Sequence, residues 1–167
     1  YLSGRASMRA GMIHPRKSYR WSGPAPANTI DKHVFSKLKQ FRENPAASCD
    51  DATFMRRACL DITGTLPDPR EAKAFVDERD PGKRTRLIDR LLASPEYAEF
   101  WAMKWADLLR VEEKTLDAKG VEIFHNWIRE SLAAGKPLDV FAREVLSATG
   151  STYGNPPANF YRALRFP

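Results

Sequence analysis

Four charged side chains that lie among apolar helix positions are the best candidates for chemistry in this sequence. Arg57 and Asp61 are spaced i,i+4, and Asp107 and Arg110 are spaced i,i+3, so each pair would share one face of a helix. Because both pairs flank positions that we expect to face the core, the four side chains would meet in a partly buried polar network. Such networks fix helix register at least as often as they perform acid–base chemistry, so we favour the structural interpretation.

Three aromatic side chains form a second candidate site. Tyr97, Trp101 and Trp105 recur at intervals of four residues in the most aromatic part of the chain, which predicts that they lie on one face of a helix. An exposed row of rings would form a platform for a ligand, whereas a buried row would pack in the core. We favour core packing for the two tryptophans.

The motifs of several other functional classes do not occur in the 167 residues. His14, His33 and His125 show no metal-ligand spacing, and the chain has neither a phosphate-binding glycine loop nor a Gly-x-Ser-x-Gly motif. Cys49 and Cys59 are not part of a Cys-x-x-Cys-His motif, so we expect no c-type haem attached within these residues. The sequence thus predicts no catalytic residue, metal or cofactor in this chain, and it favours a non-catalytic structural or interaction module over an enzyme.

The net charge of +6 is concentrated at the N-terminal end. Residues 1–42 contain nine Lys or Arg and one acid, and the rest of the chain carries a net charge of −2. A nucleic-acid-binding fold would carry its basic residues on the folded elements, so this distribution argues against a nucleic-acid partner. Every long helical stretch carries charges, so we expect no membrane span.

The candidate residues lie in a chain with helical periodicity from Thr29 onward. Proline after a capping residue is typical of a helix start and occurs at Asp68–Pro69, Asp80–Pro81 and Ser94–Pro95. The pattern predicts an all-α fold, an irregular bundle of about seven helices. These helices would begin near residues 29, 49, 69, 81, 95, 120 and 137.

Both ends of the chain differ from its helical part. Residues 1–13 alternate in polarity, which predicts a strand-like arm, and the proline-rich and glycine-rich residues 14–28 indicate a linker. After residue 150 the sequence loses its period and contains two adjacent prolines, so we expect an extended Pro-rich tail. The predicted domains are residues 1–28, 29–150 and 151–167, in a fragment of a multidomain or processed protein. Neighbouring domains or subunits would contact the arm and the tail.

Three motifs in combination resemble one known family. They are Asp61-x-x-Gly64-x-x-Pro67, Ser94-Pro95-x-Tyr97 and Trp101-x3-Trp105-x-Asp107-x2-Arg110. With their flanking stretches they resemble the planctomycete cytochrome-associated domain family of unknown function, over about residues 29–165. The resemblance implies an exported, extracytoplasmic protein, periplasmic or at the cell surface, in which the arm would be the last strand of a preceding Ig-like domain. It provides no established catalytic residue.

Two other function classes stay open beside the interaction module. The family pattern usually continues into a Cys-x-x-Cys-His segment that this chain does not reach, so a c-type haem would lie in a continuation or a partner. A redox-associated domain would position that haem, with Tyr97, Trp101 and Trp105 near the electron path. A carbohydrate-binding or degradative accessory domain is the other alternative.

Overall fold

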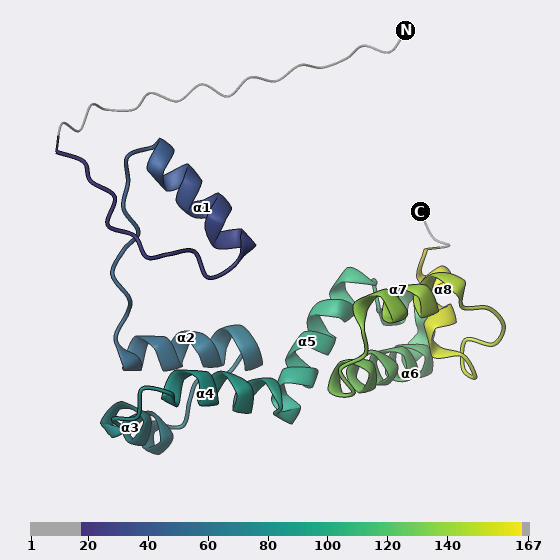
Figure 1. Ribbon diagram of the computed structural model, residues 1–167. Helices are drawn as coiled ribbons and strands as arrows, with labels where there is room; N and C mark the ends of the chain where they lie inside the picture. The colour runs from purple at the N-terminus through teal and green to yellow at the C-terminus, as the bar shows by residue number, and fades with distance from the viewer. Residues whose placement is uncertain (1–17, 165–167) are drawn as a thin grey trace, which may run out of the picture. The chain divides into compact units, whose positions relative to one another are not determined.

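The computed structural model describes residues 18–164, shown as ribbons in Figure 1. The predicted strand-like arm, residues 1–13, lies outside this range. Residues 18–164 contain eight α-helices and one 3-10 helix, with no strand among them, so the all-α prediction is confirmed. Contacts divide the chain into one unit that ends at Ser48 and another that begins at Cys49. The predicted domain limits are not tested by this division and stay a prediction.

The described part of the first unit contains one helix, α1 (Thr29–Gln40). Its N-cap is Asn28 rather than the predicted Thr29, because the Asn28 side chain accepts a backbone N–H of the first turn at 2.9 Å. The rings of Trp21 and Phe35 lie 5.6 Å apart, so the segment before α1 packs against it.

The second unit begins with three helices that share a small core. These are α2 (Asp51–Thr63), α3 (Pro69–Asp77) and α4 (Lys83–Leu92). They pack around Met55, Cys59, Phe75 and Leu87, all of which are buried. Each helix is too short to be stable alone in water, so this apolar contact holds the three together.

The predicted caps of these helices are correct at α3 and displaced at α2 and α4. Asp68 accepts the first N–H groups of α3, with Pro69 at the first helical position as predicted. Helix α2 is capped by Asp50 and begins at Asp51 rather than near residue 49. Helix α4 begins at Lys83 rather than Pro81, because the Asp80 carboxylate accepts the Gly82 N–H at 2.7 Å and closes a turn before the helix.

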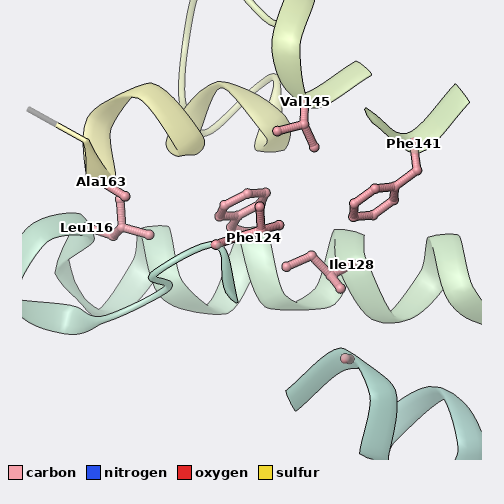
Figure 2. Close-up of a cluster of buried hydrophobic side chains, with 8 residues drawn as sticks. Leu116, Phe124, Ile128, Phe141, Val145 and Ala163 are labelled. Carbon is pink, nitrogen blue, oxygen red and sulfur yellow. The ribbon is translucent and has the colours of Figure 1, made fainter. Parts of the chain in front are cut away.

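A larger core lies among α5 (Pro95–Leu108), α6 (Glu113–Ala133), α7 (Leu138–Ser147) and α8 (Asn159–Ala163). Helix α5 packs mainly along α6 and also contacts α2, so it connects the two cores of the second unit. Figure 2 shows side chains from α6, α7 and α8 converging on Phe124. The buried members of this core are Ala102, Leu109, Leu116, Phe124, Ile128, Phe141, Val145 and Ala163.

The predicted extended tail is wrong for the described residues after Ser151. Residues Pro156–Ala158 form a 3-10 helix, and α8 follows it directly. Ala163 is fully buried in the larger core. The fixed φ of proline suits the start of a helical turn, but two turns are too short to produce a recognisable period in the sequence. The segment therefore packs as part of the fold instead of extending away from it.

Helix α6 also differs from its prediction. It begins at Glu113 rather than near residue 120, and a non-helical residue, Asp117 (φ 58°, ψ 165°), divides it. A first helical turn thus precedes a kink, and the longer helix follows. Helix α5 ends at Leu108, and Arg110 lies in the connection to α6 with φ 57°.

Candidate functional site

The four charged residues predicted to form a network are all exposed. Among the described residues, no hydrogen bond or ion pair joins the side chains of Arg57 and Asp61 or those of Asp107 and Arg110. The Arg110 guanidinium instead lies 3.9 Å from Glu112. The expected burial is wrong because α2 and α5 meet through aromatic and glycine positions and leave these charges outside. Any functional role for the four stays a prediction.

The predicted aromatic platform is divided between two regions. Tyr97 and Trp101 have ring centroids 6.3 Å apart, and the Trp101 indole Nε1 donates to the Ile62 carbonyl of α2 at 3.2 Å. Trp105 instead packs on Phe141 of α7, with centroids 5.1 Å apart. Each step of four residues turns about 40° beyond a full helical turn, so the third ring faces the larger core. Core packing therefore accounts for Trp105, while Trp101 holds the end of α2.

The turn after α2 explains one of the distinctive sequence motifs. Gly64 ends α2 with φ 71°, and a Cβ at this position would lie 2.3 Å from the ring of Phe100 on α5. Glycine is thus required both for the left-handed backbone and for the close approach of the ring. Beside it, the Thr63 hydroxyl donates to the Cys59 carbonyl at 2.8 Å. The motif fixes where α2 meets α5.

A buried lysine organises the smaller core. The Lys83 side chain is only 9% exposed. Its Nζ donates to the carbonyls of Phe75 at 2.8 Å and Glu78 at 2.6 Å, and lies 2.7 Å from the Asp51 carboxylate. Hydrogen bonds from Lys83, then from Arg84, hold the pKa of Asp51 below its ordinary value. The cluster ties the start of α2 to the α3–α4 connection. Sequence reasoning missed it because its members are about thirty residues apart.

A second polar cluster forms around the kink of α6. The Asp117 carboxylate accepts the Gly120 N–H at 2.8 Å, the Arg162 Nη2–H at 2.7 Å and the Tyr153 hydroxyl at 2.9 Å. These donors, led by the Gly120 N–H, lower the pKa of Asp117 to about 2. An aspartate with positive φ is uncommon, and here three donors from three segments hold it in place. The cluster joins α6 to α8 and to the loop before it.

Asn159 supports this cluster from inside. It is fully buried, and its Nδ2 donates to the carbonyls of Thr152 at 2.7 Å and Pro156 at 3.0 Å. Its Oδ1 accepts no hydrogen bond and lies 3.4 Å from the place where Gly120 would carry a Cβ. The absence of a side chain at Gly120 therefore lets α8 approach α6 closely. An isolated asparagine in the sequence does not predict this buried contact.

A pocket of about 670 Å³ opens between the end of α7 and α8. Arg162 forms part of its wall, so the Asp117 cluster borders it. Leu146 and Tyr161 also line it and are 61% and 41% exposed, and the Tyr161 hydroxyl donates to the Leu146 carbonyl. We refer to Leu146, residues 148–152, Tyr161 and Arg162 as the α7–α8 surface. No sequence motif pointed to it, because its residues come from the stretch that lacks a period.

Comparison with known proteins places the chain in a family. A family model described as PSCyt2, a protein of unknown function (DUF1549), matches residues 29–165. The chain belongs to the PSCyt2 family. The matched range of this PSCyt2 chain includes α1 to α8 and thus the whole α7–α8 surface. No curated protein and no solved structure shows significant similarity.

Neither a metal-binding cluster nor a membrane-spanning helix occurs among residues 18–164 of this PSCyt2 domain. No cluster of three or more His, Cys, Asp or Glu side chains in this range is arranged to hold a metal ion. None of the helices in the same range combines the length and the hydropathy that crossing a bilayer requires. The features of the described chain that stand out chemically are therefore its two polar clusters and the α7–α8 surface.

Proposed function

We propose that this PSCyt2 domain is a non-catalytic structural and interaction module of a larger exported protein, and that a partner binds its α7–α8 surface. The observation that carries the proposal is the combination of a large pocket with exposed apolar side chains. Leu146 and Tyr161 leave much of their surface open beside a pocket of about 670 Å³. Exposed apolar residues around a concave site are typical of interaction surfaces.

The α7–α8 surface is supported by buried and hydrogen-bonded residues of α8. Ala158 and Ala163, which precede and end α8, are both buried, and Asn159 between them bonds two backbone carbonyls. A surface that is already ordered loses little conformational entropy when a partner binds. This supports a docking role for the C-terminal segment in place of the free tail expected from sequence.

The polar clusters support a non-catalytic role. Lys83 bonds two carbonyls and a carboxylate of other elements, and Asp117 bonds the Gly120 N–H of its own helix and the Arg162 side chain of α8. Their donors and acceptors are used to connect helices: Lys83 joins α2 to α3 and α4, and Asp117 joins α6 to α8. Buried or strained charges of this kind specify geometry.

The rest of the proposal concerns the whole protein. We propose that residues 1–28 also contact a neighbouring domain or subunit, and that the protein acts outside the cytoplasm, as the family resemblance implies. Deletion of residues 1–28 should abolish association and leave the thermal midpoint of the unit that begins at Cys49 nearly unchanged. Differential scanning calorimetry and mass photometry of the intact and the shortened protein measure these effects. Loss of the fold of the unit that begins at Cys49 contradicts this part of the proposal.

Site-specific photo-crosslinking tests the docking role of the surface. A benzophenone amino acid is placed at Leu146 in the full-length native protein, and at Leu92 of α4 as a matched control with 47% exposure. We expect position 146, and not position 92, to crosslink to one defined peptide of a neighbouring domain or subunit, mapped by mass spectrometry. Equal products from both positions, or none from position 146 in the assembled protein, overturn the proposal.

A redox-associated domain is the second candidate, and the contact of Tyr97 with Trp101 favours it. Their rings lie 6.3 Å apart and Trp101 is 37% exposed, so this pair can approach a cofactor of a neighbour. The test is expression of the full-length protein under haem-maturation conditions. A Soret band, and a reduction potential that changes in Trp101→Phe, support this candidate; an absent Soret band removes it.

A further inference from the structure

In the loop after α7, several backbone carbonyls accept hydrogen bonds, whereas the backbone N–H groups of residues 148–152 donate none to described residues. The carbonyls of Thr149, Ser151 and Thr152 all accept hydrogen bonds, from Asn155 and Asn159. By contrast, none of the backbone N–H groups of residues 148–152 donates to another described residue. The loop therefore turns its acceptors toward the fold and leaves a run of donors. Successive unused N–H groups make a concavity that favours an anion.

None of the described residues that line the pocket beside this loop is acidic. Arg162 is the charged residue among them, and Thr149 and Thr152 line the same pocket. Residues 145–167 contain two arginines and no acidic residue. A guanidinium has five N–H donors, so the ion pair with Asp117 orients Arg162 and leaves donors for a second acceptor. The unused donors of the loop and of Arg162 favour an occupant with hydrogen-bond acceptors, and a carboxylate is the strongest acceptor that a side chain offers.

The walls of the pocket show that a bare inorganic ion would not fill it. Leu146, Ala158 and Tyr161 supply apolar surface next to the donors. A volume of about 670 Å³ matches the range of about 300–1,000 Å³ in which pockets hold ligands or several side chains. The occupant should thus carry an anionic group with apolar groups beside it, as a short acidic stretch of an extended peptide does.

We infer that the α7–α8 surface binds an aspartate or glutamate side chain in an extended segment of the partner protein. The inference rests on the proposed function and names the chemistry of the partner. The carboxylate accepts hydrogen bonds from the N–H groups of residues 149–150 and from Arg162. Apolar residues beside it in the partner segment pack on Leu146 and Tyr161.

Nuclear magnetic resonance of the ¹⁵N-labelled chain measures this directly. The probe is the blocked peptide acetyl-Leu-Glu-Leu-amide, and its matched control is acetyl-Leu-Gln-Leu-amide. We expect saturable shifts of the amide resonances of residues 149, 150 and 152 with the glutamate peptide, and binding at least tenfold weaker with the glutamine peptide. Unshifted amides at these positions, or equal binding of the two peptides, overturn the inference.

A pair of arginine variants locates the interaction. Arg162→Gln should weaken binding of the glutamate peptide about tenfold, whereas Arg143→Gln should leave it unchanged. Arg143 is a matched control because it lies on α7 outside the pocket, with a side chain 73% exposed. Since Arg162 also holds Asp117, loss of the fold in Arg162→Gln is checked by circular dichroism, and the comparison of the two peptides on the natural chain does not depend on it.

The two experiments separate this inference from the proposed function. A crosslink from position 146 to a partner, together with equal binding of both peptides, overturns carboxylate recognition and leaves the interaction module standing. Selective binding of the glutamate peptide without a crosslink in the assembled protein keeps the carboxylate site and overturns the docking role.

Discussion

At the scale of single residues, two positions with an unusual backbone conformation fix how neighbouring helices meet. Gly64 and Asp117 both have positive φ, and each lies where two helices meet. The first permits an aromatic ring to approach α2, and the second gathers donors from three segments. Strain of this kind persists only where the surroundings fix it, so both positions should be sensitive to substitution.

Gly64→Ala should lower the free energy of unfolding by about 3 kcal/mol, because the new Cβ meets Phe100 as well as an unfavourable φ. Gly135→Ala is the matched control, since Gly135 has φ 61° and nothing within 4 Å of the added atom. It should cost about 1 kcal/mol. Urea unfolding followed by circular dichroism compares the two, and equal losses would show that the ring contact does not matter.

The Asp117 carboxyl gives a prediction about pH. Its pKa is lowered from an ordinary 3.8 to about 2 by the Gly120 N–H, Arg162 and Tyr153. Because the native pKa is the lower one, the stabilisation is complete above pH about 4 and is lost as the pH falls through about 2. In Asp117→Asn, the free energy of unfolding should therefore depend less on pH between 4 and 2. Carboxyl resonances of the natural chain should give Asp117 a midpoint near 2, and a midpoint near 4 contradicts the cluster.

At the scale of elements, buried polar contacts decide how the short helices are placed. Lys83 satisfies two carbonyls and one carboxylate from outside its own helix. The ends of α2, α3 and α4 thus depend on one ammonium group, in addition to the apolar core that they share. Removal of that group would leave buried acceptors without a donor.

Lys83→Met should accordingly lower the free energy of unfolding by about 2–3 kcal/mol. Lys73→Met is the control, because Lys73 is 78% exposed and pairs with Asp77 on the same helix. Its effect should stay within about 0.5 kcal/mol. Thermal unfolding of both variants provides the comparison, and a similar small effect for both would mean that the buried contacts of Lys83 are not needed.

The elements also show how far sequence reasoning reaches. Helices with apolar periodicity and local caps, such as α3 behind Asp68 and Pro69, were predicted because the determining contacts lie within a few residues. The kink at Asp117 depends on Arg162, forty-five positions away, and could not be predicted from local patterns. The same holds for Lys83 with Asp51 and for the pocket, whose lining comes from α7, a loop and α8. The candidate site was thus missed, while the fold class was correct.

At the scale of the whole molecule, the C-terminal segment belongs to the core, and this has a consequence for truncation. Removal of residues 151–167 takes away Asn159 and Ala163, both fully buried, and the donors of Arg162 and Tyr153. We expect such a chain to lose the cooperative unfolding of α5, α6 and α7. Hydrogen exchange measured by mass spectrometry should show reduced protection in α6. Unchanged protection there would mean that the segment is a dispensable tail.

The central claim is that the α7–α8 surface is where this PSCyt2 domain binds its partner. The most direct measurement is the mass of the native assembly with Leu146→Asp or Leu92→Asp in the full-length protein, by mass photometry. Both residues are exposed, so neither change should alter the circular dichroism spectrum or the thermal midpoint. The account predicts that Leu146→Asp releases the partner and Leu92→Asp retains it. An assembly of unchanged mass in Leu146→Asp would contradict it.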